Sequence, residues 1–211
     1  MKNIVLSAIL LTSIISCTNN DKVVDSKKEV KQEMKAENSE NPIDLEKSLV
    51  YWKGTKAIGG GHQGTVKFAK GDLKFDQDVF KGGSFSIDMS TIACSDVKDK
   101  ESNADLVGHL MSKDFFAVTE FPTAEINIFD AALIEGNRYK CAAKVRIKDV
   151  EKQLVFEVDL HNRDSKRAIV GKLNFDRTQF GVVYNSSNFF KALGDKVIND
   201  DIMIKFELIQ K

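Results

Sequence analysis

Apolar and polar residues alternate with a period of two in segment after segment of the chain. In one such segment Phe85, Ile87 and Met89 alternate with the polar residues between them. The alternating segments are 65–75, 84–89, 140–148, 156–160, 169–175 and 202–208. A period of two gives each strand one face in a core and one in water, as in an antiparallel sheet. Roughly eight such strands predict an all-β domain, either a closed barrel or a two-sheet sandwich. We expect one turn at Gly71-Asp72.

The segment 105–128 breaks this pattern and predicts the one helix. From Asp105 to Ser112 the apolar residues follow a helical spacing. Pro122 then excludes a helix, because its ring fixes φ and favours an extended residue before it. Alternation resumes directly afterwards, with apolar residues at 124, 126 and 128. The segment therefore predicts a helix inserted between two strands.

The N-terminus predicts a lipoprotein signal. Lys2 precedes an apolar run from Ile4 to Ile15, too short to span a bilayer, and the run ends directly before Cys17. This junction resembles a bacterial lipobox, in which the cysteine becomes the acylated first residue. The polar stretch that follows carries no aromatic residue and cannot bury enough apolar surface to fold. We therefore expect a signal peptide at 1–16, lipidated Cys17 and a disordered tether at 17–46, and a folded domain at 47–211.

Charge and cysteine content narrow the function classes. The chain holds 31 basic and 31 acidic residues, a formal net charge of zero, and no basic cluster, which argues against nucleic-acid binding. Cys94 and Cys141 remain once Cys17 is lipidated. An oxidising envelope would permit a disulfide between them, but two cysteines without further pattern favour separate buried thiols.

No arrangement of residues predicts catalysis or a metal centre. His62, His109 and His161 lack the spacing of metal ligands, so zinc would require the fold to bring them together. Ser112 and Asp114 lie beside His109, but a triad draws its members from distant segments, so we expect these residues to end the helix. The remaining charged residues near the turns are expected to lie in turns or at the rim, and a run of glycines is expected to form a flexible bend. These are Asp176, Arg177, Asp195, Asp200, Asp201 and the glycine run 59–61.

Five segments, in order, resemble the YceI-like polyisoprenoid-binding family. They are Lys53–Phe68, Gly82–Ile92, His109–Phe116, Phe175–Ser186 and Leu193–Leu208. The block HLMSKDFF at 109–116 is the most specific, and Arg177, Phe180 and Gly181 match the family's Arg-x-x-Phe-Gly turn. The resemblance implies a lipocalin-like, up-and-down antiparallel barrel of about eight strands with a helical insertion.

The interior can be interpreted in two ways. Small inward residues such as Gly83, Ala124 and Gly171 stand beside large ones, which by themselves favour a filled core with glycines at bends. The resemblance instead implies a cavity for a long apolar molecule, a polyprenyl chain or an isoprenoid quinone, with no resident cofactor. The candidate lining residues are Phe68, Phe85, Ile87, Ala143, Phe156, Leu173 and Phe206.

The resulting hypothesis is a cell-envelope lipoprotein that carries or buffers an isoprenoid lipid. Thr18, rather than an aspartate, follows the lipidated cysteine, which favours the outer membrane. The resemblance also permits a homodimer. The main alternative is a solid-core interaction module of the envelope without a ligand, and an enzyme is the third and least supported class.

Overall fold

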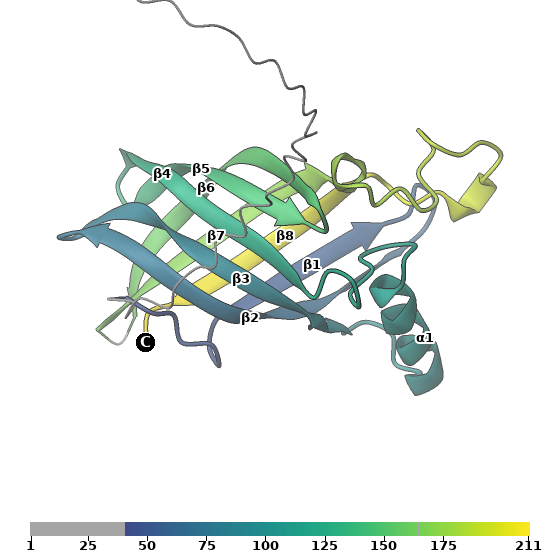
Figure 1. Cartoon of the computed structure of the whole chain (residues 1–211), viewed down its shortest axis with the longest axis horizontal. Coiled ribbons are helices and arrows are strands. Elements are labelled where there is room, and N and C mark those ends of the chain that lie inside the picture. The colour runs from purple at the N-terminus through teal and green to yellow at the C-terminus, as the bar shows by residue number, and fades with distance from the viewer. Residues whose placement is uncertain (1–40, 164) are drawn as a thin grey trace, which may run out of the picture. The chain divides into compact units, whose positions relative to one another are not determined.

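The computed structural model describes residues 41–163 and 165–211, and this part of the chain forms an antiparallel β-barrel (Figure 1). The predicted signal peptide, Cys17 and most of the predicted tether lie outside the described residues. The barrel strands are β1 (Leu49–Thr55), β2 (Gly61–Asp76), β3 (Val79–Cys94), β4 (Thr123–Glu135), β5 (Arg138–Ile147), β6 (Val150–Arg163), β7 (Lys166–Asp176) and β8 (Asp201–Ile209). The helix α1 (Lys100–Met111) lies between β3 and β4, and two short 3₁₀ helices, η1 (Arg177–Phe180) and η2 (Gly194–Lys196), lie between β7 and β8.

Each strand pairs with its neighbour in sequence, and β8 pairs with β1 to close the sheet. In this closing ladder Val50 lies opposite Phe206 and Trp52 lies opposite Ile204. The predicted barrel is therefore confirmed. A two-sheet sandwich is excluded, because its edge strands would not pair with each other.

One end of the barrel, which we call the packed half, is filled by side chains. Phe80 is fully buried there, with its ring 5.6 Å from Phe75 and 5.7 Å from Tyr139, edge-on to the latter. Leu73 and Leu208 are each only 1% exposed. Both ends of the described chain lie at this half, since an isolated bridge joins Ile43 to Gln210.

The domain begins earlier than residue 47. Ile43 is 3% exposed within the core, and its backbone N–H donates to the carbonyl of Gly71 at 3.0 Å. The prediction that residues 41–46 belong to the tether is therefore wrong. The stretch before β1 is mostly polar and does not distinguish Ile43, which closes the packed half.

The turn predicted at Gly71-Asp72 is also wrong, because β2 continues through it to Asp76 and the chain turns at Gln77, whose φ is 54°. Gly71 serves a packing role instead. A Cβ there would lie 2.6 Å from Ile43 and 2.7 Å from Phe85, so only glycine leaves space for both side chains.

Helix α1 starts five residues before the predicted Asp105, at Lys100. Its first turn carries no apolar residue, so hydrophobic spacing could not locate its start. The cap locates it instead, since the Asp99 side chain accepts a hydrogen bond from the backbone N–H of Ser102 at 2.9 Å. Within residues 41–163 and 165–211, no helix is long and apolar enough to cross a bilayer.

Candidate ligand cavity

The other end of the barrel, which we call the hollow half, encloses a cavity of about 210 Å³. Its wall comes from the ends of the strands nearest α1, and the surface facing the space is apolar. The wall consists mainly of aliphatic side chains, including Val50, Ile126, Leu154 and Ile204. A filled core, which the sequence by itself favours, therefore describes only the packed half.

Four of the predicted lining residues face this cavity, namely Ile87, Phe156, Leu173 and Phe206. Phe156 and Phe206 meet edge-on, with ring centroids 5.9 Å apart. They are the last residues of β6 and β8 that line the cavity, because Val158 and Leu208 are buried below them. The two rings therefore form the floor of the cavity.

The other three predicted lining residues, Phe68, Phe85 and Ala143, are buried but do not line the cavity. The Phe68 and Phe85 rings pack edge-on against each other at 6.2 Å, and Phe85 covers Gly71 and Gly83. These three positions are corrected to core residues. Alternation identifies the inward face of a strand, but not how far along the barrel axis a residue lies.

The small inward glycines do not create the space either. A Cβ on Gly171 would lie 2.1 Å from the ring of Phe206, and one on Gly83 would lie 2.6 Å from the ring of Phe85. At each glycine, an aromatic ring from the same or the adjacent strand packs against the backbone in the space that a Cβ would take. In the hollow half, Gly171 lets Phe206 lie against the wall rather than across the cavity.

Two segments cover the mouth of the cavity. One holds α1 and Phe115, and the other, residues 177–200, follows β7. The imidazole of His109 joins them, since its centroid lies 5.0 Å from the Phe115 ring and 4.7 Å from the Tyr184 ring, edge-on in both cases. This aromatic cluster ties the two covers together.

Arg177 holds the second cover in place. Arg177 is only 3% exposed, and its guanidinium donates to the carbonyls of Val182 at 2.8 Å and Ile198 at 3.1 Å, and to the Asp200 carboxylate at 3.3 Å. Burial lowers the pKa of Arg177, and the charges of Asp200 and Asp176 partly offset this effect. The prediction of a rim charge is therefore wrong for Arg177, because four hydrogen-bond acceptors compensate a charge buried from water.

The YceI-like domain family matches residues 42–209 of the chain. The chain belongs to this family. Solved structures with the same fold include BcnA from Burkholderia cenocepacia, with 23% identity and a TM-score of 0.64 over 80% of this chain and 99% of that one. A polyisoprenoid binding domain from Saccharophagus degradans, implicated in plant cell wall breakdown, has 11% identity and a TM-score of 0.58 over 81% and 97%. The YceI protein of Campylobacter jejuni has 14% identity and a TM-score of 0.53 over 92% and 99%. None of the curated proteins matches the chain.

In this YceI-like domain the residues near His109 have structural contacts. The Ser112 hydroxyl donates to the backbone carbonyl of His109 at 2.8 Å, and the His109 Nε2 lies 3.0 Å from the Asp114 carboxylate. Because its hydroxyl hydrogen points to a carbonyl, Ser112 is not activated by the imidazole. These contacts close the end of α1, as the sequence predicts.

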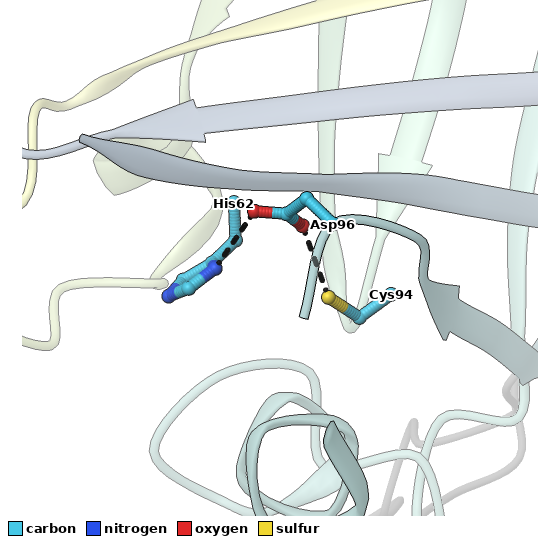
Figure 2. Close-up of side chains that lie close together, drawn as sticks. All are labelled: His62, Cys94 and Asp96. Atoms are coloured by element: carbon cyan, nitrogen blue, oxygen red, sulfur yellow. Dashed lines mark hydrogen bonds and ion pairs between the residues drawn. The ribbon is translucent and has the colours of Figure 1, made fainter. Parts of the chain in front are cut away.

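The histidines do not converge, but the rim of the YceI-like barrel brings together a set of residues that the sequence analysis missed. His62, Cys94 and Asp96 meet at the mouth (Figure 2), where the His62 Nδ1 lies 3.1 Å from Asp96 Oδ2 and the Cys94 Sγ lies 3.1 Å from Asp96 Oδ1. Burial opposes ionisation of Asp96, but hydrogen bonds from the Gln63 backbone, Cys94 and His62 outweigh it and lower the pKa of Asp96 to about 2. Cys94 and Cys141 are separate thiols.

A β-bulge explains why spacing could not reveal this cluster. Lys67 of β2 pairs with Asp88 of β3, and Thr65 pairs with Ala93. Between these two pairs β2 advances by two residues, whereas β3 advances by five. An odd surplus of three residues exchanges the two faces of β3. Cys94 therefore lies on the inward face with His62, although its distance along the chain from Ile87 would place it outside.

Proposed function

We propose that the hollow half binds the hydrocarbon part of an isoprenoid lipid, a polyprenyl chain or an isoprenoid quinone. The observation that carries the proposal is an apolar cavity open at one end of a YceI-like barrel. A polyisoprenoid binding domain among the structural neighbours supports this ligand class. The surface facing the space is apolar, which favours hydrocarbon over a charged metabolite.

The size of the cavity limits what it encloses. A cavity of about 150 Å³ holds one benzene molecule, so the 210 Å³ found here accommodates roughly one or two five-carbon units. A longer chain therefore extends through the mouth or displaces the floor.

The energetics favour a carrier or buffer over a trap. Transfer of about ten CH₂ groups from water into the cavity gains roughly 8 kcal/mol. A lipid taken from a bilayer already lies in an apolar environment, so most of this gain is absent. Uptake from a membrane is then close to neutral and readily reversed.

We further propose that the chain is an envelope lipoprotein anchored through Cys17. Large apolar side chains at the hollow end support contact with a bilayer, since Ile58 is 68% and Phe189 57% exposed. Their loops adjoin at the mouth, where the Ala57 N–H donates to the carbonyl of Val197. Cys17→Ser should move the full-length chain from the membrane fraction to the soluble fraction, and an unchanged distribution would contradict the anchor.

Mass spectrometry of an organic-solvent extract from the purified full-length chain tests the ligand. Acyl groups on Cys17 are covalent and stay with the protein, so a free polyprenyl or quinone species must come from the cavity or from loosely held membrane lipid. Two variants that each introduce a phenylalanine separate these sources. Ala124→Phe fills the cavity, and Val155→Phe enlarges a side chain that is 58% exposed on the outer wall.

The expected result is a near-stoichiometric isoprenoid species in the wild type and in Val155→Phe, and its loss in a folded Ala124→Phe. An empty wild-type extract, repeated after incubation with envelope membranes, would contradict lipid binding. The alternative would then be an interaction module, in which the exposed outer wall near Phe129 and Val155 meets another protein.

A further inference from the structure

Three side chains with three different donor atoms converge at the rim of the barrel. The imidazole Nδ1 of His62, the thiol Sγ of Cys94 and a carboxylate oxygen of Asp96 lie within 4.8 Å of one another (Figure 2). We propose that these three residues bind one late first-row divalent metal ion, with Zn²⁺ as the best fit. This site lies at the rim of the apolar cavity, whose lining includes His62, and the proposal does not depend on lipid binding.

The spacing suits a single ion. Zinc bonds of about 2.0–2.3 Å in tetrahedral geometry separate neighbouring ligand atoms by roughly 3.5 Å. The carboxylate of Asp96 already lies 3.1 Å from the His62 Nδ1 and 3.1 Å from the Cys94 Sγ. Side-chain rotations that bring the donor atoms from within 4.8 Å to about 3.5 Å of one another would place all three around one centre.

The donor set selects the metal. Thiolate sulfur and imidazole nitrogen favour Zn²⁺ and related ions, whereas Mg²⁺ and Ca²⁺ prefer oxygen donors alone. Once Cys94 has lost its proton, the thiolate and the Asp96 carboxylate carry two negative charges, which balance a divalent cation. Three protein ligands leave a fourth position for water, as in open zinc sites.

The backbone around the cluster is already fixed. The N–H of Gln63, next to His62, donates to Asp96 Oδ1 at 3.0 Å, and the N–H of Ser95 donates to the Gln63 carbonyl at 2.9 Å. On the other side the Asn103 amide of α1 donates to the carbonyl of Cys94 at 3.1 Å. Such outer contacts orient metal ligands before the ion arrives.

The binding step is balanced by one proton. The thiol of Cys94 loses H⁺ to solvent as the sulfur–metal bond forms. The imidazole of His62 binds the metal through the lone pair of Nδ1, and the hydrogen that Nδ1 donates to Asp96 in the free protein moves to Nε2 by exchange with solvent. Asp96 exchanges its hydrogen bonds from the thiol and imidazole for one bond to the metal and keeps the bond from Gln63. No redox partner is required.

Titration of the full-length chain with Co²⁺, followed by competition with Zn²⁺, tests the proposal. All proteins would carry Cys17→Ser, so that Cys94 and Cys141 are the remaining thiols. The parent should bind one Co²⁺ per chain with a thiolate-to-cobalt absorption band, and Zn²⁺ should remove that band at one equivalent. Zn²⁺ should also raise the melting temperature.

Matched substitutions identify the ligands. Cys94→Ser and His62→Gln should each weaken Zn²⁺ binding by roughly 100-fold or more, since even outer partners of a metal site contribute 10- to 100-fold. Cys141→Ala and His161→Gln remove the same residue types elsewhere and should leave the affinity unchanged. Asp96→Asn should weaken binding as well, and if that variant does not fold, Cys94→Ser and His62→Gln decide the result. Parent-like affinity in Cys94→Ser or in His62→Gln, or no thiolate band in the parent, would overturn the site.

Discussion

The same strands form the packed half and the hollow half of the barrel, but side chains fill only the packed half. In the packed half, Phe75, Phe80 and Tyr139 meet ring to ring, and Ile43 adds a plug from outside the strands. In the hollow half the wall is mainly aliphatic, and aromatic rings lie at the floor and the mouth. Alternation thus decides which side chains face inward, and aromatic volume at particular levels decides where the interior stays empty.

Two leucine-to-alanine substitutions should give the largest contrast between the halves. Leu73, which is 1% exposed in the packed half, should lose about 3–4 kcal/mol of unfolding free energy on replacement by alanine. Leu173 already faces the cavity, so Leu173→Ala should cost less than half as much. Urea unfolding with unchanged m-values would measure both. Equal losses would mean that the cavity is collapsed in solution.

The next largest contrast should be between the stability lost on replacing a buried arginine and that lost on replacing an exposed one. Arg177→Met removes the donor to Asp200 Oδ1 and to several carbonyls at the mouth and should cost about 3 kcal/mol. Arg138→Met, at the packed end, breaks an exposed ion pair with Asp159 and should cost less than about 1 kcal/mol. Hydrogen exchange of residues 177–200 should rise only in Arg177→Met, and unchanged protection there would contradict its anchoring role.

Added bulk should distinguish enclosed positions from cavity positions. Ala143 is fully buried away from the cavity, so Ala143→Leu should destabilise the barrel by about 1–3 kcal/mol through overpacking. Ala124 lines the cavity, so Ala124→Leu should have an effect within about 0.5 kcal/mol, because its added carbons enter empty space. Thermal unfolding would compare the two variants, and a larger loss of stability in Ala124→Leu would contradict the assignment of Ala124 to the cavity wall.

The reactivity of the two cysteine thiols compares the interior with the rim without any substitution. Burial raises the pKa of the Cys141 thiol to about 12, with a further contribution from Asp130, so this thiol stays protonated at neutral and mildly alkaline pH. Its fully buried sulfur also excludes reagents, whereas Cys94 is partly exposed at the rim. Iodoacetamide at pH 8 should label Cys94 in the native full-length chain and Cys141 only after denaturation. Labelling of both at similar rates would show that the barrel opens readily.

The sequence predicts those features that depend on regular spacing. Alternation identifies the strands and the inward faces of Ile87, Leu173 and Phe206, and the resemblance of five segments identifies the closed barrel. Features that depend on a single irregular event were missed. The β3 bulge brings Cys94 to His62, and Ile43 enters the core from a mostly polar stretch.

The burial of Arg177 was missed for a related reason. A charged residue after a strand favours the surface, and only the fold of residues 182–200 supplies the acceptors that make its burial possible. The family's Arg-x-x-Phe-Gly pattern was the one sequence signal for a structural role of Arg177. Its other members have such roles, since Phe180 is buried and Gly181 has a φ of 73°.

The pairing of β1 with β8 also predicts an order of events during folding. Leu49 lies opposite Glu207, so the last contacts to close the barrel join the two ends of the domain. Such long-range pairing is slow, because the ends of a long loop must first meet. Until β8 arrives, the partly formed sheet exposes two edges and an apolar face, a surface prone to aggregation. During that interval the future cavity is an open trough, and hydrophobic molecules or chaperones have access to it that the finished barrel no longer gives.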